Sequence, residues 1–195
     1  MAMRSNLLTS LVIVVAACGA PTGPAPTGPA AGATPGVRVV GDDVGATGPD
    51  SAPAGEPAAI LTAHNRYRAA HCVPPLAWSA ELAAVAQRWA NHLRDAGCAF
   101  EHSGDKYGEN LAAGTTGYLG AESSVDMWYR EIELYDFARG GFSMQTGHFT
   151  QVVWRGTTQV GCGSAQCGGM TTWVCNYDPP GNWEGAYAAN VPPPC

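Results

Sequence analysis

The sequence contains few charged residues and no run of basic ones. Charged side chains make up 13% of the 195 residues, and 10 lysines and arginines face 16 aspartates and glutamates, which gives a net charge of −6. A protein that holds nucleic acid needs a basic surface to neutralise phosphates. The composition therefore excludes nucleic acid as a partner. The length fits one domain with appended segments.

Several short motifs of enzymes and metal sites are also missing. The chain has no CxxC pair of a zinc ribbon, no HExxH helix of a zinc peptidase and no GxSxG turn of a serine hydrolase. Ser103 follows His102, but adjacent side chains rarely face each other, so we do not interpret the two as a nucleophile and its base. The sequence favours binding over catalysis.

The first 18 residues are typical of an export signal. Arg4 precedes an apolar stretch from Leu7 to Ala17, which is shorter than the roughly 20 residues that a membrane-spanning helix needs. The ending VAAC resembles the bacterial lipobox, in which the cysteine, here Cys18, becomes a lipidated N-terminus that anchors the protein to the membrane. The alternative is an ordinary signal peptide cleaved after Ala17 or Ala20. Both predict a location outside the cytoplasm.

Residues 19–57 are rich in proline, alanine, glycine and threonine and repeat the sequence PTGPA. Such a segment has too little apolar surface to offset the entropy of ordering, so we expect an extended, disordered tether. A short strand over Val37–Val40 is the alternative within it. The globular domain is expected over residues 58–195.

Three helices are predicted in the first part of this domain. The first follows Pro57, and we interpret His64 on its apolar face as a core histidine. The second, Ser79–Ala96, begins at a serine cap and presents one apolar face. The third, from about Ala121 to Phe137, carries Glu131 at the edge of its apolar stripe, where a carboxylate needs a partner.

The last third of the chain is expected to form strands. Phe149–Trp154, Thr158–Cys162 and Thr171–Tyr177 are β-branched and aromatic, and the last two fit a hairpin with a turn at Gly163–Gly169. Helices followed by strands indicate an α+β domain. His148 stands at the entrance of the first strand, either as a structural residue or facing a pocket.

Six cysteines remain when Cys18 is set aside, and an even number in an exported domain indicates disulfides. These cysteines are Cys72, Cys98, Cys162, Cys167, Cys175 and Cys195. Fifteen connectivities are possible if all six pair, and the residue pattern does not choose among them.

Seven segments of residues 58–195 occur in the order found in the CAP superfamily of cysteine-rich secretory, venom-allergen and pathogenesis-related proteins. They are HNRYR at 64–68, LAWS at 76–79, HSGDKYGENLA at 102–112, VDMWYREI at 125–132, GHFTQVVWRGT at 147–157, VGCG at 160–163 and CNYDPPGN at 175–182. The residues of these segments are most similar to those of the microbial and fungal branch, whose yeast members bind and export sterols.

The resemblance implies a three-layer α-β-α sandwich stabilised by disulfides, with a central cavity lined by His102, Glu109, Glu131 and His148. Neutral imidazoles suit a divalent metal, zinc above all, so His102 and His148 are the expected ligands. The alternative is that the four side chains only satisfy one another by hydrogen bonds. The resemblance also implies the disulfides Cys162–Cys175 and Cys98–Cys167, which leaves Cys72 with Cys195.

The matching ligand loop is Ala113–Ser124, with Ala113–Gly120 as an irregular stretch and Tyr118 and Leu119 at its tip. These two residues either close over a ligand or fold back on the domain. We therefore expect an exported protein that binds a small apolar ligand, such as a sterol, a fatty acid or another lipid. A metal-dependent hydrolase using the same histidines and glutamates, and a protein that binds a partner through its surface, are the alternatives.

Overall fold

The structure is a computed structural model that describes residues 54–195. The predicted export signal, Cys18 and the Val37–Val40 run lie outside the described residues. The elements are α1 (Glu56–Ala70), β1 (Ala77–Trp78), α2 (Ala80–Asp95), β2 (Gly108–Thr115), α3 (Ala121–Tyr129), the 3-10 helix η1 (Arg130–Leu134), α4 (Gly147–Val152), β3 (Gln159–Cys167), β4 (Met170–Asp178) and α5 (Tyr187–Asn190). Within this part of the chain, every helix is too short or too polar to cross a membrane.

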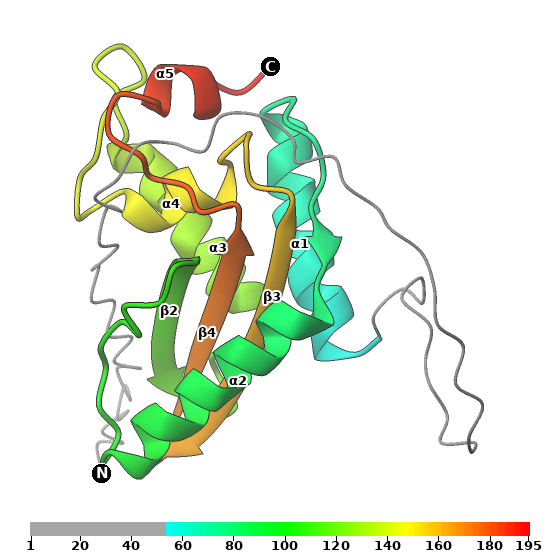
Figure 1. The fold of residues 1–195 in the computed structure, drawn as a ribbon, viewed down its shortest axis with the longest axis vertical. Coiled ribbons are helices and arrows are strands. Elements are labelled where there is room, and N and C mark those ends of the chain that lie inside the picture. The colour runs from blue at the N-terminus through cyan, green and yellow to red at the C-terminus, as the bar shows by residue number, and fades with distance from the viewer. Residues whose placement is uncertain (1–53) are drawn as a thin grey trace, which may run out of the picture.

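A four-stranded sheet of order β1-β3-β4-β2 forms the middle layer (Figure 1). β4 pairs antiparallel with both β3 and β2, and the two-residue β1 pairs parallel with β3. α2 covers one face, where Leu93 packs with Leu111 and Val174. α1, α3 and α4 cover the other face, with Trp128 and Phe149 in the larger core. The predicted three-layer α-β-α sandwich is confirmed.

The first two helices form as the sequence predicts. In α2, the hydroxyl of Ser79 accepts a hydrogen bond from the Leu82 N–H at 3.2 Å and so caps the helix. α1 begins at Glu56, so it includes two residues that the sequence assigns to the tether, and Pro57 lies in its first turn. His64 is fully buried on α1, which confirms its interpretation as a core histidine.

The prediction of a strand over Phe149–Trp154 is wrong, because Gly147–Val152 forms the helix α4. All six residues of α4 are buried, including the polar Thr150 and Gln151. A fully buried run has no alternation of apolar and polar residues, so its period cannot separate helix from strand. Thr150 is accommodated by hydrogen bonds to the Gly147 carbonyl and the Asn182 side chain.

Three further boundaries differ from the prediction. The third helix ends at Tyr129 and continues as η1, not as α-helix to Phe137. The hairpin strands run on to Cys167 and restart at Met170, so the turn is Gly168–Gly169 and not Gly163–Gly169. Both turn glycines have positive φ, 58° and 80°. β2 takes in Ala113–Thr115, which the sequence places in a loop.

The three predicted disulfides are confirmed; two of them join parts of the domain that are distant in sequence, and Cys162–Cys175 joins the paired strands β3 and β4. They are Cys72–Cys195, Cys98–Cys167 and Cys162–Cys175. The first holds the C-terminal residue against the end of α1, where the Cys195 N–H also donates to the Ala70 carbonyl at 3.0 Å. The tail is thereby fixed to the domain.

A buried arginine joins α1 to the segment between α4 and β3. The guanidinium of Arg68 donates to four backbone carbonyls, those of Pro74, Val152, Trp154 and Thr157, at 2.7–3.0 Å. Burial lowers the pKa of Arg68 to about 10, so the group stays charged at neutral pH. Its hydrogen bonds provide partners for buried carbonyls, of which that of Trp154 also accepts from the Thr157 N–H at 3.1 Å.

Candidate functional site

The four residues that the resemblance selected form two histidine–glutamate pairs. His148 Nδ1 lies 2.7 Å from Glu131 Oε1, and His102 Nδ1 lies 2.6 Å from Glu109 Oε1. Each pair spans two elements: η1 supplies Glu131 and α4 supplies His148, while β2 supplies Glu109 and the segment before it supplies His102. Both pairs agree with the alternative in which the groups satisfy each other.

Glu131 does more than bind the imidazole of His148. Its second carboxylate oxygen accepts hydrogen bonds from the backbone N–H groups of His148 at 3.0 Å and Phe149 at 3.1 Å. These are among the first N–H groups of α4, which have no partner inside the helix. The Thr146 side chain does not cap α4, so the carboxylate takes this role from 17 and 18 residues away in sequence. Negative charge at a helix N-terminus is favourable.

The imidazole of His148 is held in one orientation, and one of its ring nitrogens has no hydrogen-bond partner among the described residues. The side chain is fully buried, and its ring lies nearly parallel to Trp128, with 6.2 Å between centroids. Nδ1 donates to the Glu131 carboxylate, so Nε2 is the acceptor in the neutral ring. Nε2 has no hydrogen-bond partner within residues 54–195. Buried polar atoms normally have one, so this nitrogen is a candidate contact for a ligand.

The second pair is closer to solvent. The His102 side chain is 20% exposed, and that of Glu109 is 7% exposed. Burial alone would raise the pKa of Glu109, but hydrogen bonds from the His102 ring and from Ser103 outweigh it and hold this pKa below its ordinary value. The Ser103 N–H donates to Glu109 Oε1 at 2.9 Å. Glu109 is therefore ionised at neutral pH.

Two buried asparagines support the pairs. Asn176 on β4 donates to Glu109 Oε2 at 3.4 Å, and Asn110 on β2 donates to the His148 carbonyl at 3.2 Å. Asn110 also donates to the Tyr177 hydroxyl, which lies 2.9 Å from His64 Nε2. These asparagines were not predicted from the sequence. The sequence feature that could have indicated them is an amide side chain next to apolar strand residues, Asn110 in the GEN segment and Asn176 in the CNYD segment, because a buried amide needs hydrogen-bond partners.

The described geometry does not bring the four groups into one metal site. Residues 54–195 contain no group of three or more histidine, cysteine, aspartate or glutamate side chains placed to hold a metal ion. An imidazole whose Nδ1 donates to a carboxylate is the usual form of a metal-binding histidine. A zinc site needs three or four ligands, however. The residues present fit the orientation of single ligands but not a complete site.

The predicted ligand loop presents one of its two apolar residues. Tyr118 is 74% exposed, whereas Leu119 is only 8% exposed and belongs to the core. Leu119 packs so closely on Gly114 that a side-chain carbon at Gly114 would lie 2.8 Å from the Leu119 β-carbon. The Leu119 carbonyl accepts a hydrogen bond from the Trp173 indole at 3.4 Å. Leu119 therefore folds back on the domain, and Tyr118 alone projects into solvent.

Comparisons with known proteins agree with the fold and with the motifs. A family model described as the cysteine-rich secretory protein family (CAP) matches residues 61–177. "Repressed by EFG1 protein 1" of Candida albicans is 51% identical over 128 residues, which are 63% of this chain and 45% of that protein. Pathogenesis-related protein 1A of Nicotiana tabacum is 45% identical over 129 residues, 64% of this chain and 76% of that protein.

A solved structure gives the same picture of the fold. The crystal structure of NaASP2 with Zn²⁺ superimposes with a TM-score of 0.57 at 24% identity, covering 72% of this chain and 88% of that chain. The matched region of this chain spans less than half the length of the Candida protein.

Proposed function

Because the chain belongs to the cysteine-rich secretory protein (CAP) family, we propose that it is an exported protein that binds a small apolar ligand, such as a sterol, a fatty acid or another lipid. The export-like first 18 residues and the six paired cysteines support a location outside the cytoplasm. The resemblance to the fungal branch supports an apolar ligand.

The observation that carries the ligand proposal is the exposure of Tyr118 on an anchored loop. A tyrosine that is 74% exposed leaves its ring in water, and an apolar ligand that covers the ring gains from removing that surface from solvent. Leu119 anchors the loop in the hydrophobic core, so the loop loses little conformational freedom when a ligand binds. Tyr118 is therefore a contact residue in this proposal.

The test is a titration of the purified protein with a fluorescent sterol and a fluorescent fatty acid. Saturable binding that weakens in Tyr118→Ser is expected. Leu134→Ser is the matched control, because Leu134 is 63% exposed but lies outside the loop. The absence of saturable binding with both lipid classes, or an equal loss in both variants, contradicts the proposal.

Anchoring through Cys18 is a separate part of the proposal. Protein recovered from the membrane fraction should begin at Cys18 and carry the added mass of acyl chains in intact mass spectrometry. Cys18→Ala should move the protein from membranes to the medium. A wild-type protein found in the medium with an unmodified N-terminus at or after Cys18 would show that it is secreted without an anchor.

A second candidate is divalent metal binding by His102 and His148, with zinc the best match to imidazole donors. The buried Nε2 of His148 without a partner favours it. Zinc would supply a Lewis acid only if other ligands, such as water molecules, completed its coordination, because the described residues do not form a complete site; the chain would then be a candidate metal-dependent hydrolase. Glu131 and Glu109 would keep Nδ1 of each histidine protonated and Nε2 available.

Zinc titration by calorimetry tests this candidate without any assay of activity. One zinc per chain, lost in both His102→Gln and His148→Gln, is expected, with His92→Gln on α2 as the control. Hydrolysis of peptide or cell-wall substrates that depends on the same two histidines would support the hydrolase. Zinc binding that persists in both variants would exclude this site.

A further inference from the structure

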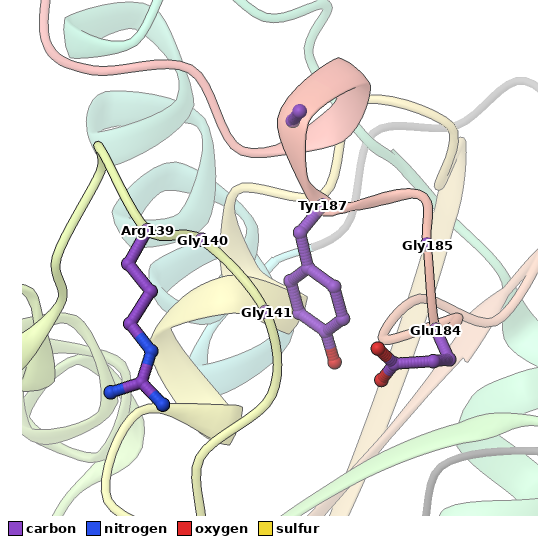
Figure 2. Close-up of a pocket in the computed structure, with 7 residues that line it drawn as sticks. Arg139, Gly140, Gly141, Glu184, Gly185 and Tyr187 are labelled. Atoms are coloured by element: carbon purple, nitrogen blue, oxygen red, sulfur yellow. The ribbon is translucent and has the colours of Figure 1, made fainter.

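A hollow lies at the end of the domain that carries α5, away from the residues discussed above. It is an open hollow of about 220 Å³ between the loop before α4 and the segment that leads into α5 (Figure 2). Its lining residues are Arg139, Gly140, Gly141, Glu184, Gly185, Tyr187 and Ala188. We call it the Arg139–Glu184 pocket. It shares no residue with the histidine–glutamate pairs or with the Tyr118 loop.

Hydrogen bonds hold the first wall of the pocket in place. The side chain of Asp136 accepts from the Ala138 and Arg139 N–H groups at 2.9 and 3.2 Å, and its carbonyl accepts from the Gly140 N–H at 2.8 Å. Gly140 and Gly141 have positive φ, 61° and 91°, a conformation that favours glycine. This wall is therefore a defined turn that presents the Arg139 side chain.

The second wall is held equally well. Asn190 of α5 accepts from the Gly156 N–H at 2.9 Å and donates to the Ala186 carbonyl at 2.9 Å. The Tyr187 ring packs edge-to-face on Trp154, with 5.2 Å between centroids. Walls that are ordered before binding reduce the entropy that a ligand must offset.

The two charged residues of the pocket have opposite sign and stand apart. Figure 2 shows the Arg139 and Glu184 side chains on either side of the Tyr187 ring. Within residues 54–195, neither charge takes part in an ion pair. A side-chain carbon built on Gly141 or Gly185 would meet no atom within 4 Å, so the pocket is open beside these two glycines.

We propose that the Arg139–Glu184 pocket binds a small zwitterion, a molecule that carries an ammonium group and a carboxylate or phosphate group. Arginine presents a planar fork of donors that matches carboxylate or phosphate oxygens, and glutamate accepts hydrogen bonds from an ammonium. A ligand with one charge would leave the other side chain of the pocket unmatched. The volume is below the range of about 300–1,000 Å³ that sites for drug-sized ligands have, so the hollow suits only a small molecule.

Two sources share this chemistry, a free amino acid or short peptide and the head group of a zwitterionic lipid. Glycylglycine represents the first and O-phosphoethanolamine the second. Each is titrated into the ¹⁵N-labelled protein while the amide signals of Gly140, Gly141 and Gly185 are followed by NMR. Saturable shifts at these glycines with either probe support the proposal, and the tighter probe identifies the source. N-acetylglycine and ethanolamine, which carry one charge each, should bind more weakly.

Neutral variants separate a built site from general charge effects. Arg139→Gln and Glu184→Gln should each weaken binding of the better probe by about tenfold or more, because each removes a charge-assisted contact. The matched controls Arg88→Gln and Glu81→Gln, both exposed on α2, should leave binding unchanged. The proposal is overturned if neither zwitterion shifts the three glycines, if the singly charged compounds bind equally well, or if binding survives both pocket variants.

Discussion

The carboxylate of Glu131 and the imidazole of His148 meet at the N-terminus of α4, where Glu131 also accepts hydrogen bonds from the N–H groups of His148 and Phe149. One side chain thus orients the histidine and caps the helix that carries it. Loss of this carboxylate affects folding as well as the site, so a change at Glu131 needs a stability measurement before any loss of binding is interpreted.

Glu131→Ala should lower the free energy of unfolding by about 2–3 kcal/mol, since it removes a helix cap and a hydrogen bond to a buried ring. Glu131→Gln keeps an acceptor oxygen and should cost less. Glu133→Ala, an exposed neighbour on η1, is the control and should stay within about 0.5 kcal/mol. Urea denaturation provides the measurement. Equal effects of the alanine changes at both positions would show that Glu131 does not cap α4.

Arg68→Lys should be strongly destabilising although it keeps the charge. The ammonium of lysine cannot reach the four carbonyls that the guanidinium contacts, so some stay buried without a partner. A loss of about 3 kcal/mol is expected in chemical denaturation. Arg66→Lys changes an exposed arginine with ion pairs to Glu122 and Asp126 and should cost no more than about 1 kcal/mol. Similar losses at both positions would contradict the role of Arg68.

The stability of the protein should fall between pH 6.5 and pH 4 because of His64. Burial, as the main cause, lowers the pKa of His64 from 6.5 to about 4 in the folded protein. Between pH 6.5 and pH 4 the His64 imidazole binds a proton in the unfolded chain but not in the folded protein. The free energy of unfolding is therefore unaffected by His64 above pH 6.5 and decreases as the pH falls towards 4. The loss amounts to about 3 kcal/mol.

His64→Gln removes this titration. Its unfolding free energy, measured at intervals from pH 4 to pH 7, should depend less steeply on pH than that of the wild type. The pKa of His71 is also lowered by burial, but His71 is present in both proteins and does not affect the difference. Identical pH dependences would show that His64 is not the group responsible.

Two glycines on β3 let α2 approach the sheet. A side-chain carbon on Gly161 would collide with the Ala83 backbone nitrogen, and one on Gly163 would lie 2.5 Å from the Gln87 α-carbon. Gly161→Ala and Gly163→Ala should each cost about 2–3 kcal/mol, because backbone must move to admit the methyl group. Gly120→Ala, where the nearest atom is 3.9 Å away, should cost less than about 1 kcal/mol. The measurement is the thermal unfolding of the three variants. Equal losses of stability in all three would contradict the close approach of α2 to Gly161 and Gly163.

The parts of the fold that the sequence predicted have local causes. α2 combines a serine cap with one apolar face, and both act within a few residues. The two long strands β3 and β4 are separated by a glycine turn, which marks the hairpin. The resemblance to the CAP superfamily, which rests on the order of the motifs, predicted the three layers, the disulfide pairs and the four histidine and glutamate residues.

The remaining features depend on tertiary contacts. α4 is buried on all sides, so its sequence shows neither a helical nor a strand period, and Thr150 and Gln151 need partners from distant segments. Ala113 and Gly114 have weak strand preference and become part of a strand by pairing with β4. The division of four site residues into two separate pairs, and the pocket around Arg139, follow from positions that no local pattern encodes.

α1 runs along the long axis of the domain. α1 begins in the lower half of Figure 1 and ends at the top, beside α5 and the C-terminal residue. The Cys72–Cys195 bond keeps the chain's end at that upper side. The start of α1 and the Arg139–Glu184 pocket beside α5 therefore lie at different levels of the domain, and the C-terminal residue lies on the side of the pocket.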